Sequence, residues 1–167
     1  MKRQDIRNSH ATYTNYAGNP KTILEIASGD GRWTKELKKI APDAHIEVLD
    51  KDPDYMEQCK VATGNKLTYH IADARNLPED VKEKKFDVIW VQGLAQYFSD
   101  AEFKRFLDSL KNILSSDGKI FLKEQFFCNK GYCKTMFVKD SYIRSLACFK
   151  AAISDYTVTA ADKFSFD

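Results

Sequence analysis

The chain has 167 residues, of which 43% are hydrophobic and 30% charged, a composition typical of a globular domain and not of a disordered chain. Its net charge of +2 neither demands nor excludes a nucleic-acid partner. No apolar run approaches the roughly 20 residues that cross a bilayer, and the polar N-terminus lacks the apolar core of a signal peptide. We therefore expect no membrane partner and an intracellular protein, cytoplasmic or nuclear.

Strand-like and helix-like segments alternate along the chain. Apolar runs predict strands at residues 22–26, 46–49, 67–71, 86–91 and 119–126. Apolar residues at helical spacing predict helices at residues 34–40, 54–62, 101–114 and 141–153. Two last runs, 156–160 and 163–166, are interpreted as a closing antiparallel pair. We expect residues 1–20 to form a short N-terminal lid segment and residues 21–167 to form one α/β domain, with a mostly parallel seven-stranded sheet and helices on both faces.

A glycine-containing turn follows the first predicted strand. It reads Ala27-Ser28-Gly29-Asp30-Gly31 and leads into a predicted helix. Such a turn lets a ligand approach the backbone closely, because glycine lacks a Cβ and tolerates positive φ. Asp50 ends the second strand about 20 residues later, where Rossmann-type sites place the carboxylate that binds a ribose diol. We interpret the pair as a site for a nucleoside-bearing cofactor, and the alternative is an ordinary turn without a ligand.

Acidic side chains at this turn indicate which cofactor to expect. Glu25 precedes the turn and Asp30 lies inside it. Carboxylates repel a pyrophosphate but suit a ligand that carries an ammonium and a sulfonium. Here the chain resembles the class I S-adenosyl-L-methionine (SAM)-dependent methyltransferases, whose first motif is an acidic residue followed by x-G-x-G-x-G; Ala27 stands at the first glycine position. The resemblance implies a Rossmann-like class I methyltransferase fold and SAM as the cofactor.

Asp73 and Ala74 follow the third predicted strand. In class I methyltransferases an Asp-Ala pair at this place reads adenine: the carboxylate accepts from the exocyclic amine, and the next backbone N–H donates to the ring. The alternative is a polar turn before Pro78.

The fourth predicted strand distinguishes between families. It ends Asp87-Val88-Ile89-Trp90-Val91-Gln92 and lacks the Asn-Pro-Pro-Tyr motif of adenine N6 and glutamine methyltransferases. This strand end resembles the protein α-N-terminal methyltransferases, which methylate the amine of chains that begin Xaa-Pro-Lys. The resemblance extends over residues 22–153 and implies a protein or peptide substrate.

Residue roles follow from this resemblance. Arg32 would pair with the methionine carboxylate of SAM, and Gln92 would border the methionine portion near the transferred methyl group. The alternatives are a solvated arginine at a helix start and a strand-end polar group satisfied by its neighbours. The cofactor-binding residues that the resemblance implies are Glu25, Ala27, Gly29, Gly31, Arg32, Asp50, Lys51, Asp73, Ala74 and Gln92.

The acceptor side departs from that family. Gly93 stands where the family has an aromatic residue, Tyr97 where it has a histidine, and the stretch 128–135 is basic where the family is acidic. The candidate catalytic residues are therefore Gln92, Tyr97 and Glu124, with Glu124 as the base. Packing is the alternative role for Tyr97, and capping is the alternative for Glu124.

Three functions remain open. The first is a protein N-methyltransferase, and the second is an RNA or small-molecule methyltransferase, suggested by the basic stretch 119–139 with its interleaved aromatic residues. The third is a non-catalytic methyltransferase-fold subunit, or a chain that needs an activating partner subunit.

Four cysteines are spread along the chain: Cys59, Cys128, Cys133 and Cys148. They form no C-x-x-C pair and accompany no histidine cluster, so we expect no metal and interpret them as reduced thiols of an intracellular protein.

Overall fold

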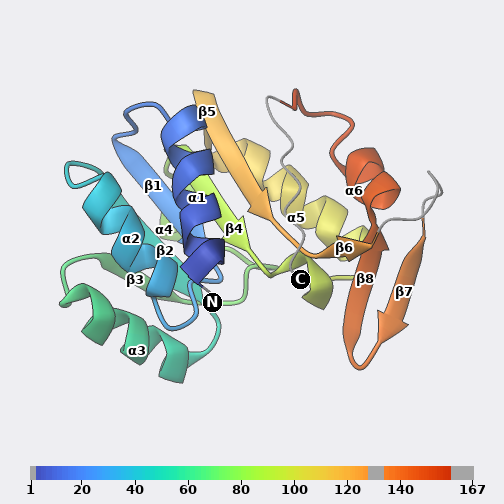
Figure 1. Ribbon diagram of the computed structural model, residues 1–167, viewed down its shortest axis with the longest axis horizontal. Helices are drawn as coiled ribbons and strands as arrows, with labels where there is room; N and C mark the ends of the chain where they lie inside the picture. The colour runs from blue at the N-terminus through green and yellow to red at the C-terminus, as the bar shows by residue number, and fades with distance from the viewer. Residues whose placement is uncertain (1–2, 128–133, 159–167) are drawn as a thin grey trace.

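The computed structural model describes residues 3–127 and 134–158 (Figure 1). Its centre is a parallel sheet of five strands in the order β3-β2-β1-β4-β5. The strands are β1 (Thr22–Ile26), β2 (His45–Asp50), β3 (Thr68–Ile71), β4 (Phe86–Gln92) and β5 (Leu114–Lys123). All their carboxyl ends meet at one edge of the sheet, which is where open α/β sheets bind ligands.

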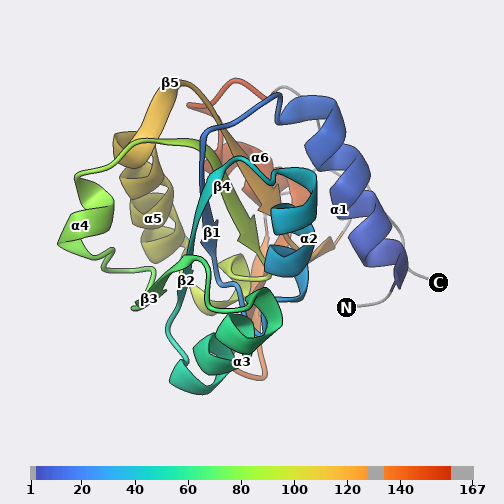
Figure 2. The same cartoon turned by 90° about the vertical axis from the view of Figure 1, so that its left-hand side faces the viewer.

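Helices cover both faces of this sheet, which lies between two helical layers in Figure 2. One layer consists of α1 (Arg3–Tyr16), α2 (Arg32–Ile40) and α3 (Pro53–Thr63). The other consists of α4 (Glu79–Lys82), α5 (Asp100–Ile113) and α6 (Leu146–Ala152). A 3₁₀ turn, η1 (Ala95–Tyr97), joins β4 to α5. The predicted α/β architecture, a mostly parallel sheet with helices on both faces, is thus confirmed.

The helix boundaries follow local sequence signals. Asp52 caps α3 by accepting the backbone N–H groups of Asp54 and Tyr55, and Pro53 opens that helix. Ser99 and Glu102 form a capping box at the start of α5. The apolar stripe of α5 then buries Phe103, Phe106, Leu107, Leu110 and Ile113 against the sheet.

The N-terminal segment contains the helix α1, which packs on the β5 side of the sheet (Figure 1). The Tyr13 ring stacks on Phe121 with centroids 6.2 Å apart, and Lys123 donates to the Ser9 hydroxyl at 2.6 Å. Tyr13 is therefore an aromatic anchor of the core. The movement of this segment as a lid stays a prediction.

The sheet differs from the predicted seven strands, because the described residues place five in it. Residues 156–158 do not form a strand; the Tyr156 hydroxyl donates to the Leu107 carbonyl at 2.5 Å and so binds this segment to α5. The rest of the predicted closing pair, 159–166, lies outside the described residues.

A second, three-stranded sheet replaces part of a predicted helix. It consists of β6 (Phe126–Phe127), β7 (Thr135–Val138) and β8 (Ser141–Ser145), in the order β6-β8-β7. The prediction of one helix over 141–153 is wrong for its first five residues, which pair antiparallel with β7. Lys139 and Asp140 adopt positive φ and make the tight turn that this pairing needs, and Ser145 then caps α6.

The two described cysteines differ. Cys59 is a buried free thiol, as expected. Cys148 is disulfide-bonded, so the expectation of four reduced thiols is wrong for Cys148.

Candidate active site

Backbone hydrogen bonds align the loops at the carboxyl ends of the strands. Ala27 donates to the Leu49 carbonyl at 2.8 Å, which continues the β1–β2 ladder into the glycine turn. Ala72 donates to the Asp50 carbonyl at 3.0 Å in the same way. The turn after β1 and the ends of β2 and β3 therefore form one continuous rim.

The turn after β1 adopts the left-handed backbone that its sequence predicts. Gly29 has φ 54° and Gly31 has φ 77°, and Gly31 caps α2. Ala27 has φ 62°, so it adopts a left-handed conformation although it carries a side chain. A Cβ at Gly29 would meet nothing within 4 Å, which leaves the outer side of the turn open to a ligand.

Asp50 lies directly against this turn. Its carboxylate accepts the backbone N–H of Gly29 at 2.8 Å and that of Asp52 at 3.0 Å. The side chain is buried, yet each carboxylate oxygen has a second lone pair for a hydroxyl donor. This arrangement suits a ribose diol bound beside the turn.

Glu25 is the most buried acid of the site, with 2% of its surface exposed. Burial raises its pKa to about 8; the Thr34 hydroxyl opposes that rise, and the charge of Asp50 adds to it. Its Oε2 atom has no hydrogen-bond partner among the described residues. With a pKa of about 8 the Glu25 carboxyl holds a proton at neutral pH in the free chain, and an ammonium beside its unpartnered oxygen would favour the ionised form. The site therefore fits SAM, whose methionine portion carries an ammonium.

Asp73 lies at the end of β3, where the adenine-reading carboxylate was expected. It pairs with Arg75 at 2.9 Å and also accepts the backbone N–H of Arg75 at 2.9 Å. Ala74, the expected partner of Asp73, is buried in the core beneath the loop. The carboxylate is close to half-exposed, so it stays accessible while Arg75 orients it.

Arg32 lies farther from the centre of the site than the resemblance implies. It begins α2, its guanidinium pairs with Asp30 at 2.8 Å, and 57% of its side chain is exposed. The structure thus places Arg32 on the surface beside the turn, and its pairing with a methionine carboxylate stays a prediction.

Lys51 and Tyr97 approach one another across the strand ends. The Lys51 ammonium lies 5.8 Å from the centre of the Tyr97 ring, which is within cation–π range. Lys51 follows β2 and Tyr97 follows β4, with β1 between these strands in the sheet. Tyr97 is 49% exposed, so its ring faces solvent at the rim.

Gln92 ends β4, and Glu124 directly follows the neighbouring strand β5. Gln92 lies in register with Lys123. Glu124 accepts the backbone N–H groups of Leu94, at 3.0 Å, and of Ala95. Burial raises the Glu124 pKa to about 7, against the effect of these two bonds and of the Arg144 charge. This geometry is that of a capping group, whereas the catalytic role predicted from the sequence stays a prediction.

Two arginines near the site were missed at the sequence level. Arg75 donates to Asp73, Glu102 and the Tyr97 carbonyl. Arg144, on β8, donates to Asp100 and to two backbone carbonyls. Only the position of Arg75 directly after Asp73-Ala74 could have indicated its role. Nothing in the sequence indicates the role of Arg144, because it binds backbone carbonyls, which every residue type carries.

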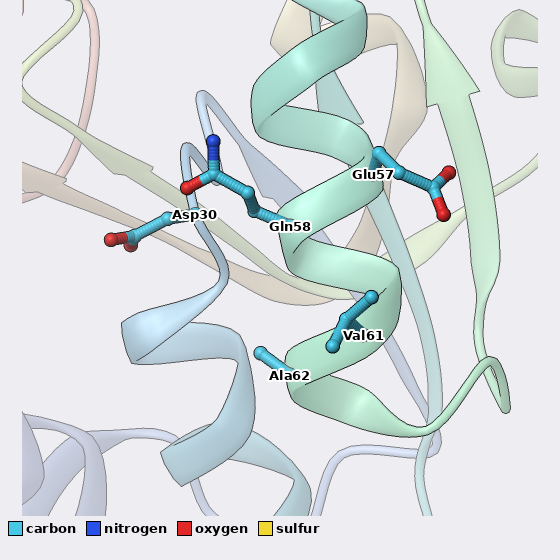
Figure 3. A pocket seen from close by; sticks show the side chains of 5 residues that line it. All are labelled: Asp30, Glu57, Gln58, Val61 and Ala62. Carbon is cyan, nitrogen blue, oxygen red and sulfur yellow. The ribbon is translucent and has the colours of Figure 1, made fainter.

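A hollow of about 410 Å³ lies beside this site, and Figure 3 shows the side chains that line it. Its lining residues are Asp30, Glu57, Gln58, Val61 and Ala62. They come from the turn after β1 and from one side of α3, and Glu57 points away from Asp30 (Figure 3). None of them belongs to the ends of β2 to β5, so we assign the hollow no part in cofactor binding.

Metal and membrane features were searched in residues 3–127 and 134–158. In that part of the chain no group of three His, Cys, Asp or Glu side chains is arranged to hold a metal ion. None of its helices has the length and apolar character needed to cross a bilayer.

Known proteins with similar sequences are methyltransferases. Phosphoethanolamine N-methyltransferase 1 of Triticum aestivum is 28% identical over 127 residues, which is 74% of this chain and 25% of that protein. Malonyl-[acyl-carrier protein] O-methyltransferase 1 of Ilyobacter polytropus is 30% identical over 112 residues, which is 66% of this chain and 39% of that protein. The chain thus spans less than half the length of these curated relatives.

Solved structures share the fold. A SAM-dependent methyltransferase of Leishmania major superposes with a TM-score of 0.74 at 24% identity, covering 90% of this chain and 60% of that one. Coclaurine N-methyltransferase, solved with N-methylheliamine and SAH (S-adenosylhomocysteine), has a TM-score of 0.61 at 15% identity, covering 70% of this chain and 35% of that one.

The family comparison covers more than half of the chain, because the methyltransferase domain family matches residues 23–118. This range contains the glycine turn, Asp50, Asp73 and the end of β4. The chain therefore belongs to the methyltransferase domain family and has the fold of the SAM-dependent methyltransferases.

Proposed function

We propose that this chain is a SAM-dependent methyltransferase that methylates a protein N-terminal amine or another protein nitrogen. One observation carries the proposal: three acids gather at the carboxyl edge of the sheet, beside an open left-handed turn. They are Glu25 on β1, Asp50 at the end of β2 and Asp73 in the loop after β3. Carboxylates at these places suit the ammonium, the ribose diol and the adenine amine of one ligand.

The chain's own residues then have defined tasks. Asp50, whose carboxylate the Gly29 amide holds in place, would bind the ribose side; Asp73, oriented by Arg75, would bind the base, and buried Glu25 would face the cationic end. SAM supplies the methyl group from a sulfonium that leaves as a neutral thioether. The protein contributes mainly alignment and exclusion of water, and its acceptor amine must be neutral when it attacks.

The protein acceptor is supported by the strand end Trp90-Val91-Gln92, which resembles that of the protein α-N-terminal methyltransferases. Gln92 lies in register with Lys123 at the β4–β5 edge, beside the turn that carries Tyr97. Gln92 and Tyr97 are the candidate residues on the acceptor side, and Glu124 supports the backbone between them.

A small-molecule amine is the second candidate. The Triticum aestivum relative is named a phosphoethanolamine N-methyltransferase, which favours a small amine with an anionic group. An RNA acceptor and a non-catalytic subunit that needs a partner are the remaining alternatives, and the experiments below separate them.

Cofactor binding is tested first, by calorimetry with SAH and the purified chain. We expect binding by the wild type, a loss of at least about tenfold in Asp50→Ala, and no change in Asp43→Ala, which removes an exposed carboxylate outside the site. No binding by the wild type at millimolar SAH would reject both enzyme functions for this chain.

The acceptor is tested with methyl-labelled SAM and an extract of undermethylated cells. Label that protease releases, followed by sequencing of the labelled peptides, would support the protein acceptor. Label in a ribonuclease-sensitive or a small-molecule fraction would replace it with the corresponding alternative.

A further inference from the structure

The turn between β4 and α5, residues 94–98, is held by side chains from three distant parts of the chain. We call this segment the β4–α5 turn. It contains η1, follows Gln92 by one residue, and presents the half-exposed ring of Tyr97 at the rim of the site.

Arg144 holds the carbonyl side of this turn from β8. Its Nη1 donates to the Ala95 carbonyl at 2.6 Å, its Nη2 donates to the Phe98 carbonyl at 2.5 Å, and its Nε donates to Asp100 at 2.8 Å. The planar guanidinium therefore spans the whole of η1, and its flat face lies 5.0 Å from the centre of the Phe103 ring.

Two more side chains complete the hold. Arg75, from the loop after β3, donates to the Tyr97 carbonyl at 2.6 Å. Glu124, from the end of β5, accepts the Leu94 and Ala95 amides. All three carbonyls and both amides named here are thus bound by charged groups, which make stronger hydrogen bonds than neutral ones.

Arg144 is only 2% exposed, and a buried guanidinium is costly unless its donors are satisfied. A hydrophobic residue would fill the same place at lower cost if the position served only packing. What a guanidinium adds is a fixed fork that sets the distance between the Ala95 and Phe98 carbonyls, and with it the conformation of the residues between them.

We propose that Arg144 is a positioning residue for the methyl acceptor: by fixing the β4–α5 turn onto the β7–β8 hairpin, it sets the position of Tyr97 at the rim of the site. This inference rests on the proposed function. Arg75 supports the same turn from the cofactor side, so the turn couples the base-binding loop after β3 to the acceptor side.

The test uses the full chain with Arg144→Lys, which keeps the charge but loses the fork, and Arg105→Lys, an exposed control on α5. Asp100→Asn separates the ion pair from the carbonyl bonds, because Asp100 is largely exposed and its loss leaves both carbonyl bonds intact. Three quantities are measured: SAH affinity, transfer of labelled methyl groups into an undermethylated extract at limiting and saturating extract, and amide exchange of residues 94–98.

We expect Arg144→Lys to bind SAH within about twofold of the wild type, to transfer methyl groups about 10–100 times more slowly at saturating extract, and to exchange its turn amides faster. Arg105→Lys and Asp100→Asn should transfer within about threefold of the wild type. Retained SAH binding shows that the variant is folded. If it does not fold, Arg75→Lys loosens the same turn from the more exposed loop after β3, and it should speed amide exchange of residues 94–98 and slow transfer at saturating SAM in milder form. SAH affinity is left out of that comparison because Arg75 also orients Asp73.

If Arg144→Lys binds SAH, transfers methyl groups at the wild-type rate and exchanges its turn amides at the wild-type rate, the inference is overturned and the proposed function stays intact. Equal losses in SAH binding and transfer would also overturn it, because they would indicate a general structural role. Failure of the wild type to bind SAH would instead reject the proposed function.

Discussion

Helix α3 packs directly on the glycine turn through Cys59: a Cβ added to Gly31 would lie 2.8 Å from both the Cα and the Sγ of Cys59. This contact fixes the turn against a backbone atom, which cannot move away as a flexible side chain can. The turn after β1 is therefore preorganised by the packing of α2 and α3 before any ligand binds.

Gly31→Ala is predicted to destabilise the chain by roughly 2–4 kcal/mol, because strain at φ 77° adds to the clash with Cys59. Gly29→Ala is the matched variant, with φ 54° but open space around the new Cβ, and should cost only about 1 kcal/mol. Urea unfolding followed by circular dichroism measures both. Equal losses would mean that α3 does not constrain the turn.

Ala27 offers the opposite change. It holds φ 62° with a side chain, so Ala27→Gly should relieve strain of about 1–2 kcal/mol, of which the greater entropy of glycine in the unfolded chain cancels about half. We expect a net stabilisation of about 0.5 kcal/mol and a small rise in melting temperature. Ala62→Gly, on helix α3, is the control and should destabilise by about 0.5–1 kcal/mol. A loss of stability in Ala27→Gly would show that the alanine is not strained.

Local patterns account for what the sequence predicted correctly. Strand β1 has the predicted bounds, and α5 starts within one residue of its predicted start, because its capping box and apolar stripe are both local signals. Asp50 was placed correctly against the turn because the carboxyl ends of adjacent parallel strands lie side by side. A residue that ends β2 therefore lies next to the turn that follows β1.

Long-range partners account for what was missed. Residues 141–145 have helix-compatible spacing, yet they pair with β7 through a turn in which Lys139 and Asp140 adopt positive φ. Aspartate is common in this conformation but lysine is not, so the turn has only a weak signal in the sequence. Arg144 binds backbone carbonyls 46 and 49 positions away, and no pattern of side chains reveals such acceptors.

The burial of Glu25 predicts a pH-dependent stability. Its pKa is raised from 4.5 to about 8, so between these values the folded chain holds a proton that the unfolded chain releases. The contribution of protonated Glu25 to the free energy of unfolding is therefore fully present below about pH 4.5. It decreases as the pH rises toward 8, by up to about 1.4 kcal/mol per pH unit. Glu25→Gln cannot ionise and should lack this part of the slope.

Urea unfolding at several pH values between 5 and 8 measures the effect. The stability of Glu25→Gln relative to the wild type should rise across this range, and Glu57→Gln, an exposed acid on α3, should run parallel to the wild type. Glu124 has a raised pKa of about 7 and contributes a slope of the same sign, so Glu25→Gln keeps a residual dependence. Parallel curves for Glu25→Gln and the wild type would mean that Glu25 ionises normally in the folded chain.

A substitution of Arg32 distinguishes between two roles for this side chain, a cofactor contact and a surface ion pair. In the structure it pairs with Asp30 and is largely exposed, and exposed pairs contribute about 0–1 kcal/mol to stability. If Arg32 also binds the methionine carboxylate, Arg32→Ala should weaken SAH binding by about tenfold or more, since a charge-assisted hydrogen bond contributes roughly 1.5–3 kcal/mol. The stability of the chain should change by less than about 1 kcal/mol.

Asp30→Asn is the matched control for this prediction. It removes the competing carboxylate and leaves the guanidinium in place, so SAH affinity should stay equal or increase. Calorimetry on both variants gives the answer directly. Unchanged affinity in Arg32→Ala would assign the arginine to the surface alone, and the methionine carboxylate would then need a partner elsewhere on the rim. Weakened binding in both variants would point to the Asp30–Arg32 pair acting as a unit that shapes the turn.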